Sequence, residues 1–528
     1  MKPTLLTLTL AASVTLAGCN IEPQDGTGSD NRTGLNGLAV DGRIAGGKVW
    51  ADMNNNNRID DFEPYAYTDS DGYYSYNPLT NTNYCALPVI SDEYQRYCLI
   101  YGSSLDSIVI RIKGGTDLST GERLKGVMAM TSSISASSVR SSTPLVLSPI
   151  TTLLSGANSD YARNEIREAL NITSDADLRM DFSTASDTKA RQFLANSIAV
   201  QTMMDVLTSS TDNGQAETNN QLELINRLSQ QVAMGARPVE FSQSHVQNLT
   251  SSLISNTQTI SRVTNRLADL NVEIQRIESA VDLTAVNAQL KASEVISQLI
   301  KREASSSDAD AVKRILDSGI NNLSSSLSGS MNSSTVEFDI ASITNSLVDT
   351  GKTATTTLTS TELNTATTEA ATEATLATGT QWGGSWFVLE ATADDSDDLA
   401  AGSYIAIRLD GNADSTNGRI GTCVNVSAAN PEDDDDVFEN EYLGGRWSKL
   451  SEGAILLTFD YEGQEFSGQM KAKVQNEGEA QKFRFTTEID GATESGDLVL
   501  NETRQASLSS VARPTSSEDC VSKVNASL

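Results

Sequence analysis

Residues 246–281, VQNLTSSLISNTQTISRVTNRLADLNVEIQRIESAV, carry the strongest periodicity of this 528-residue chain. Apolar side chains recur every seven residues over about five heptads. A second series with the same spacing lies between them and is apolar except for Asn256. The first series is Val246, Leu253, Ile260, Leu267, Ile274 and Val281, and the second is Leu249, Asn256, Val263, Leu270 and Ile277. We expect this seam to pack in an intramolecular helical bundle, with the apolar residues of 286–300 as a second helix. A coiled coil with another copy of the chain is the alternative.

The regions around this seam differ from one another in composition. Residues 156–350 are expected to be helical, because apolar residues recur every three or four positions. Residues 351–378 are almost entirely Thr, Ala, Leu, Ser and Glu, which predicts a linker and leaves its helical content open. Residues 379–528 hold three of the four tryptophans and a series of short strand candidates, which predicts an antiparallel β-barrel or β-sandwich. Gly384-Ser385-Trp386 resembles the opening signature of a lipocalin-type barrel.

Residues 36–155 alternate short strand candidates with turn clusters such as Asp71-Gly72. The segments DGRIAGGKVW (41–50) and TDSDGYY (68–74) resemble the carboxypeptidase-regulatory and Cna-B families. That resemblance implies a β-sandwich-like module that serves as a spacer or a binding platform. The expected fold class is therefore multidomain α+β, with an N-terminal sandwich-like module, a central helical region and a C-terminal β-domain.

The N-terminus predicts where the protein resides. A short apolar segment ends in Leu16-Ala17-Gly18-Cys19, which resembles the lipobox of bacterial lipoproteins. The resemblance implies that residues 1–18 are a signal peptide and that Cys19 carries acyl chains, such as palmitate. Asn20 follows the cysteine at the position where an inner-membrane signal would show Asp, so we expect the protein at the outer membrane. Whether it faces the periplasm or the cell exterior is left open. Residues 19–35 are polar and Gly-rich, which predicts a flexible tether.

Charge and cysteine content limit the possible partners. The formal net charge of −31 disfavours binding to nucleic acids and to anionic lipids. Besides Cys19 the chain has four cysteines, which allow three pairings in an oxidising compartment. The first two of these cysteines share one segment of the chain and the last two share another. We therefore expect the disulfides Cys85–Cys98 and Cys423–Cys520. Because His245 is the single histidine, a zinc site with two or more histidines cannot be assembled.

Residues 52–63, DMNNNNRIDDFE, have the spacing of a calcium loop. In such 12-residue loops, oxygen ligands come from positions 1, 3, 5, 7, 9 and 12. The corresponding residues are Asp52, Asn54, Asn56, Arg58 through its carbonyl, Asp60 and Glu63. Asn57 replaces the usual glycine at position 6, where asparagine is the next best residue for a left-handed turn. The sequence therefore predicts a calcium ion that stiffens this loop.

These features favour a non-catalytic, lipid-anchored envelope protein that acts in adhesion, scaffolding or ligand presentation. The chain has neither a Gly-x-Ser-x-Gly nucleophile motif nor a Gly-rich phosphate loop. A protein or glycan partner is expected, and the chain is either a monomer or an oligomer formed through its helices. Two alternatives remain: a small molecule or glycan bound inside a lipocalin-like barrel, and a hydrolase that uses carboxylates.

Overall fold

The structure, a computed structural model, describes two compact units, one from Asn31 to Ala374 and one from Thr375 to Leu528. The described residues are 33–85, 96–101, 108–124, 126–132, 144–209, 217–250, 257–305, 308–333, 335–390, 403–426, 438–461, 464–475, 480–489 and 492–526. Over these ranges, no helix combines the length and the apolar character needed to cross a membrane.

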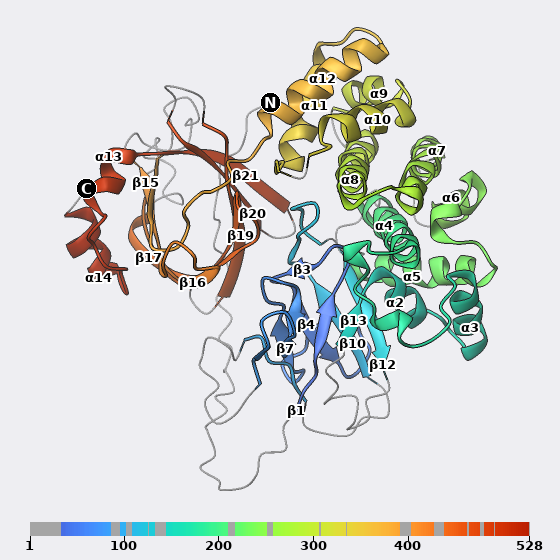
Figure 1. Ribbon diagram of the computed structural model, residues 1–528, viewed down its shortest axis with the longest axis horizontal. Helices are drawn as coiled ribbons and strands as arrows, with labels where there is room; N and C mark the ends of the chain where they lie inside the picture. The colour runs from blue at the N-terminus through green and yellow to red at the C-terminus, as the bar shows by residue number, and fades with distance from the viewer. Residues whose placement is uncertain are drawn as a thin grey trace, which may run out of the picture. The chain divides into compact units, whose positions relative to one another are not determined.

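The first unit begins with two small sheets that pack face to face (Figure 1). One sheet has the order β12 (Val127–Ser132), β10 (Ile108–Lys113), β4 (Lys48–Asp52) and β5 (Tyr65–Tyr67). The other has the order β13 (Leu145–Leu147), β2 (Gly37–Ala39) and β6 (Tyr73–Tyr74), with β13 parallel to β2. Three short pairs complete the module: β1 (Thr33–Gly34) with β9 (Ile100–Tyr101), β3 (Ile44–Ala45) with β11 (Thr116–Asp117), and β7 (Tyr76–Asn77) with β8 (Thr82–Asn83).

Alternation along the strands builds the core between these sheets. On β10, Ile108, Ile110 and Ile112 point into the core, because successive strand residues face opposite sides. Leu145 and Leu147 of β13 meet them from the second sheet. The two sheets therefore share one core.

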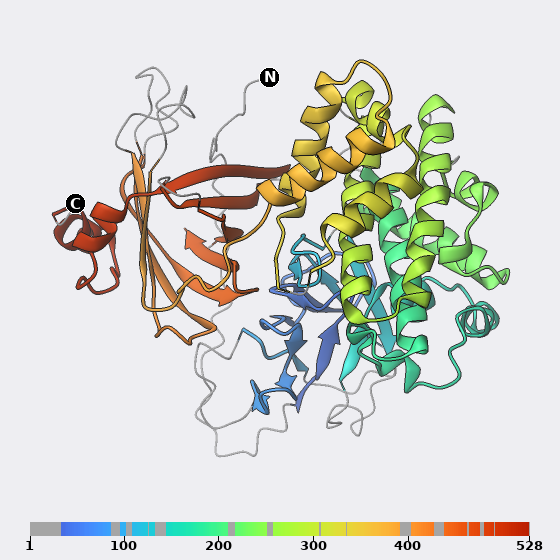
Figure 2. The same cartoon turned by 45° about the horizontal axis from the view of Figure 1, so that its top comes forward.

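Helices make up the rest of the first unit (Figure 2). The α-helices are α2 (Pro149–Ser155), α3 (Asp160–Ala169), α4 (Thr188–Ser209), α5 (Glu217–Ala233), α6 (Gln243–Thr250), α7 (Thr257–Ile274), α8 (Leu283–Ser305), α9 (Ala309–Leu316), α10 (Ile320–Ser330), α11 (Ile340–Thr353) and α12 (Ser360–Glu373). Single 3₁₀ turns are η1 (Asp177–Arg179), η2 (Phe182–Thr184), η3 (Pro238–Glu240) and η4 (Gln275–Ser279). The β-module and the helical region, which we expected as separate domains, belong to one unit because Leu38, Tyr73 and Val146 are part of the helical core.

The seam is part of an intramolecular bundle. Seam residues of α6, α7 and η4 are buried in the helical core, and α7 packs against α8. The seam does not reach its expected end, since the helical structure stops at η4 and Val281 is 90% exposed. Residues 251–256, in the middle of the seam, lie outside the described part of the chain.

The expected linker at 351–378, whose helical content the sequence left open, is mostly helical and packs into the bundle. The end of α11 and all of α12 lie in this segment, and α12 packs against α10 and α11. Leu363, Ala366 and Ala370 form a buried stripe with helical spacing. Thr359 and Glu362 form a capping box that starts α12. The low-complexity composition hid an amphipathic helix whose apolar face consists mostly of alanine.

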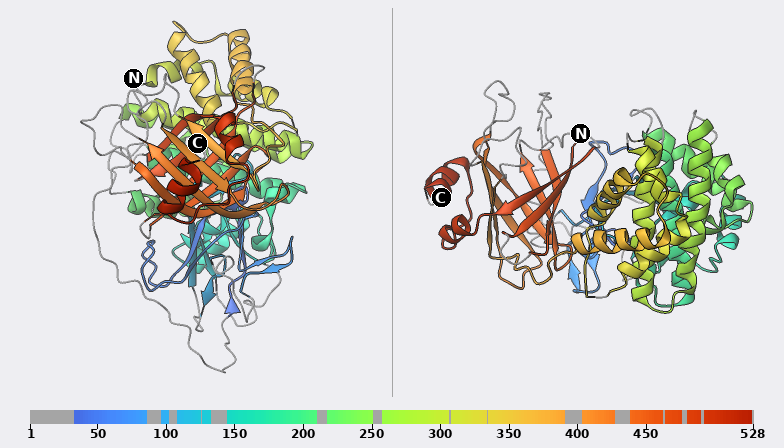
Figure 3. Two further views of the ribbon diagram at one scale, coloured as in Figure 1. Left: turned by 90° about the vertical axis from the view of Figure 1, so that its left-hand side faces the viewer. Right: turned by 90° about the horizontal axis from the view of Figure 1, so that it is seen from above.

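The second unit is a closed antiparallel barrel of eight strands (Figure 3). The barrel strands are β14 (Trp386–Glu390), β15 (Tyr404–Leu409), β16 (Asn417–Val426), β17 (Phe438–Lys449), β18 (Ala454–Tyr461), β19 (Gln464–Ala472), β20 (Lys482–Ile489) and β21 (Ala492–Leu500). Each strand pairs with the next, and β14 pairs with β21 to close the barrel. Closure excludes the β-sandwich alternative for this domain.

The C-terminal segment covers part of the outer surface of the barrel. It contains α13 (Glu502–Ser507), α14 (Ser517–Asp519) and the π-helical turn η6 (Cys520–Asn525), drawn in red in Figure 3. Leu508 and Val524 pack with the outward-facing Trp386 and Val388 of β14. This small second core explains why an outward-facing tryptophan is buried.

Candidate functional site

Asp52, the last residue of β4, organises the first half of the predicted calcium loop. Its side chain is buried, and its Oδ2 accepts the backbone N–H of Asn57 at 3.0 Å. The same carboxylate forms an ion pair with Arg111 of the neighbouring strand β10. Oδ1 of Asp52 accepts the backbone N–H of Asn56 at 3.1 Å. Asn57 has a φ of 61°, the left-handed conformation that this position of a calcium loop requires.

Glu63 closes the second half of the loop. Its Oε1 accepts the backbone N–H of Met53 at 2.7 Å, and its Oε2 accepts that of Asp60 at 3.2 Å. Glu63 is 3% exposed, so both ends of the loop are held by buried carboxylates. The loop is therefore curled by its own acidic residues.

Three other predicted ligands meet on the exposed side of the loop. The carboxamide nitrogens of Asn54 and Asn56 both donate to Oδ2 of Asp60, at 2.7 and 2.9 Å. Arg58 is exposed, and its backbone N–H donates to Oδ1 of Asn56 at 2.8 Å. Thus Asn54, Asn56 and Asp60 converge on one point, while Asp52 and Glu63 are engaged by backbone N–H groups and by Arg111.

These donors match calcium in kind, since every predicted ligand offers oxygen. The buried carboxamide of Asn57 also has no hydrogen-bond partner for either polar atom in the described structure. However, Arg111 already neutralises Asp52. Among the described residues, no three Asp, Glu, His or Cys side chains form a group that could hold a metal by themselves. An ion here would need the asparagine oxygens, so calcium stays a prediction.

Both expected disulfides are present. Cys85 is bonded to Cys98, and Cys423 is bonded to Cys520. The second bond ties the C-terminal segment to β16, on the outside of the barrel. Cys19, the predicted acylation site, lies outside the described residues, as does the predicted tether up to residue 32. The end of that predicted tether belongs to the β-module instead, because Thr33 and Gly34 form β1 and Leu35 is buried in the core.

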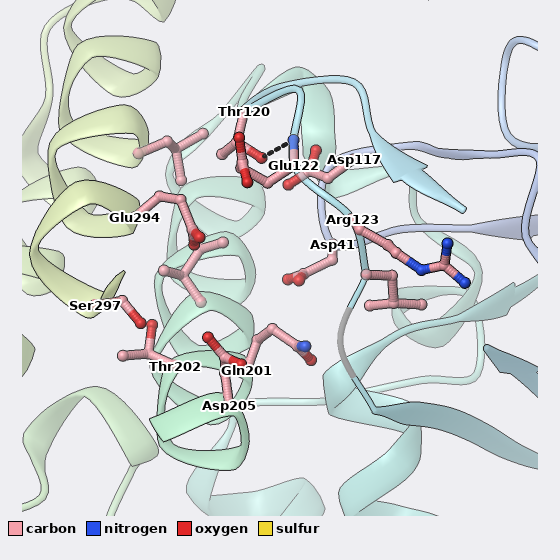
Figure 4. Close-up of a pocket in the computed structure, with 13 residues that line it drawn as sticks. Asp41, Asp117, Thr120, Glu122, Arg123, Gln201, Thr202, Asp205, Glu294 and Ser297 are labelled. Atoms are coloured by element: carbon pink, nitrogen blue, oxygen red, sulfur yellow. Dashed lines mark hydrogen bonds between the residues drawn. The ribbon is translucent and has the colours of Figure 1, made fainter. Parts of the chain in front are cut away.

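A partly open acidic cavity lies in the first unit, at a place that the sequence analysis did not single out (Figure 4). It holds about 40 Å³, room for a few water molecules or a small hydrated ion. Three parts of the chain line it with polar side chains: the β-module with Asp41, Asp117, Thr120, Glu122 and Arg123, α4 with Gln201, Thr202 and Asp205, and α8 with Glu294 and Ser297. Since these parts are far apart in sequence, no local motif marks the cavity.

The carboxylates of this cavity repel one another. Asp41 is 5% exposed, and Figure 4 shows its carboxylate directed into the cavity. Burial, together with the charges of Asp117 and Glu294, raises the pKa of Asp41 well above its usual range. Burial also raises the pKa of Asp117. Oδ1 of Asp41 has no hydrogen-bond partner in the described structure.

Some of the other acidic residues at the cavity have partners. Lys301 donates to both oxygens of Asp205, at 2.9 and 3.0 Å. The carboxamide nitrogen of Gln298 donates to Glu122 at 3.2 Å and to Glu294 at 3.0 Å. The cavity is therefore polar and strongly acidic, with Asp41 as its least compensated group.

Apolar side chains occupy the barrel interior. Trp382, Phe387 and Phe483 make ring contacts with centroid separations of 5.4–5.9 Å. Trp447 is also buried in this cluster, so the three tryptophans of the domain are core residues rather than an exposed stacking surface. Five barrel-strand side chains that pack against the cluster are only partly buried: Ile405, Leu443, Phe485, Leu498 and Leu500.

No protein-family model, curated protein or solved structure matches the chain.

Proposed function

We propose that this chain is a non-catalytic, lipid-anchored envelope protein that presents its C-terminal barrel to a ligand or partner. The closed barrel is the observation that carries this proposal, because apolar inward side chains remain partly accessible in it. The covalently fixed C-terminal segment stiffens the outside of the barrel. Acylation of Cys19 would hold the protein at the outer membrane, and adhesion or scaffolding would follow from what the barrel binds.

Membrane attachment is tested by replacing the acylated residue. We expect the parent to incorporate labelled palmitate and to fractionate with the outer membrane, whereas Cys19→Ser loses the label and becomes soluble. Equal fractionation of the parent and the variant would contradict the anchoring proposal.

We also propose that calcium stiffens the loop 52–63. The curled backbone and the meeting of Asn54, Asn56 and Asp60 support this. Asp52→Ala is a poor test, because it leaves the buried Arg111 unpaired, which costs about 3–5 kcal/mol whether or not calcium binds. Asp60→Asn is better, since it removes a predicted ligand charge and keeps the size of the side chain.

We expect millimolar calcium to raise the unfolding midpoint of the parent, and Asp60→Asn to lose most of that rise. An affinity on the order of 10⁻⁴–10⁻³ M is typical of extracellular calcium modules. The exposed neighbour Asp61 is not at a ligand position, so Asp61→Asn should keep the rise. A parent that is indifferent to calcium would refute the loop site.

A small apolar ligand inside the barrel is the second candidate function, and the partly accessible Ile405 and Phe485 favour it. The test is titration of unacylated Cys19→Ser protein with N-phenylnaphthylamine, read by energy transfer from the barrel tryptophans. We expect saturable binding that Phe485→Glu weakens about tenfold, because it places a charge in the lumen. Thr486 points to the outside of the barrel, so Thr486→Glu serves as the control. Binding that does not saturate, or that is equal in both variants, would exclude this site.

A further inference from the structure

Five carboxylates line the acidic cavity between the β-module and helices α4 and α8, those of Asp41, Asp117, Glu122, Asp205 and Glu294. Lys301 pairs with Asp205, and Gln298 donates to Glu122 and Glu294. Burial of like charges costs several kcal/mol per group unless a counter-charge or a proton is present.

Asp41 points to a ligand independently of the acidic composition. Its carboxylate is 95% buried, it is directed into the cavity, and its Oδ1 lacks a hydrogen-bond partner in the described structure. Buried polar groups are nearly always paired, so an oxygen left unpaired at a polar cavity indicates a water or an ion. The cavity of about 40 Å³ has room for either.

We propose that this cavity binds a hydrated divalent cation, with Asp41 as its principal carboxylate. The carboxylates do not gather closely enough to form a direct three-residue metal group. The ion would therefore retain several waters, as Mg²⁺ usually does in proteins. Thr202 and Ser297 offer hydroxyl oxygens from the two helices. Because the ligands come from the β-module, α4 and α8, the ion would fasten the module to the bundle.

The site is separate from the loop 52–63, and the experiment must keep the two apart. All measurements are therefore made in an Asp60→Asn background, which removes a ligand of the loop. Thermal unfolding of the full chain is compared at neutral pH in EDTA and in millimolar MgCl₂. Isothermal titration with Mg²⁺ alone gives the stoichiometry.

We expect Mg²⁺ to raise the unfolding midpoint of the first unit by a few degrees and to bind once per chain. Asp41→Asn should remove this response. Glu369→Gln, an exposed substitution on α12, should leave the response intact.

Two outcomes would overturn the proposal. One is an unchanged Mg²⁺ response in Asp41→Asn, and the other is the absence of any Mg²⁺ response in the parent. Either result leaves the anchoring and barrel proposals standing, because they depend on other residues.

Discussion

The carboxylate of Asp177 links the turn at Thr173 to helix α4. Its Oδ1 pairs with Lys189 of α4 at 2.7 Å, and its Oδ2 accepts from the backbone N–H and hydroxyl of Thr173 at 2.7 and 2.9 Å. Burial opposes ionisation, but the hydrogen bonds from Lys189, Thr173 and Ser174 outweigh it and lower the pKa of Asp177 to about 2. The charged form is therefore the one that stabilises the fold.

This lowered pKa predicts a pH-dependent effect of Asp177→Asn. A carboxylate with a depressed folded pKa stabilises above its unfolded pKa of 3.8, and the contribution is lost as pH falls towards about 2. We expect the variant to lose about 1 kcal/mol of unfolding free energy at pH 7, about half of that at pH 3 and little near pH 2, measured by urea unfolding. Asp175→Asn, at an exposed carboxylate two residues away, should change little at either pH. A difference that persists undiminished at pH 3 would contradict this account.

At the scale of elements, α12 is the helix most at odds with its composition. Leu363 is fully buried on the face that packs against α10 and α11. We expect Leu363→Ala to cost about 2–5 kcal/mol of unfolding free energy, because it leaves a cavity in the helical core. Thr361→Ala lies on the exposed face of the same helix and should cost under about 0.5 kcal/mol. Equal, negligible effects in chemical unfolding would mean that this segment is a linker after all.

Elements whose signal is local in sequence were predictable. The seam of 246–281 indicated a packed helix, because heptad spacing places the apolar residues on one helix face whatever that face packs against. The two strand-rich regions were also recognised. Whether α12 would form was left open, because alanine and threonine give a weak amphipathic contrast. Barrel closure was undecided, because it depends on the pairing of β14 with β21, more than a hundred residues apart.

The candidate sites, too, were predictable only where their residues are close together in the sequence. The residues of the loop 52–63 are contiguous, so the sequence shows their spacing directly. The ion pair between Asp52 and Arg111 could not be predicted, because it joins two separate strands. The acidic cavity joins Asp41 to Asp117, α4 and α8, and nothing local distinguishes these carboxylates among 69 acidic residues. Only tertiary packing brings them together. The disulfides were predictable because each pair lies within one segment.

At the scale of the whole molecule, the division into two units predicts two separate unfolding transitions. Each unit has its own core and its own disulfide, Cys85–Cys98 in the first and Cys423–Cys520 in the second. Replacing Cys423 and Cys520 by serine frees a long loop of the unfolded barrel, which should cost about 2–4 kcal/mol. That loss should lower only the barrel transition, which tryptophan fluorescence reports because three of the four tryptophans lie there. The matching double replacement of Cys85 and Cys98 should lower only the other transition in calorimetry. If either variant shifts both transitions together, the two units unfold as one cooperative body and the presented barrel is not an independent domain.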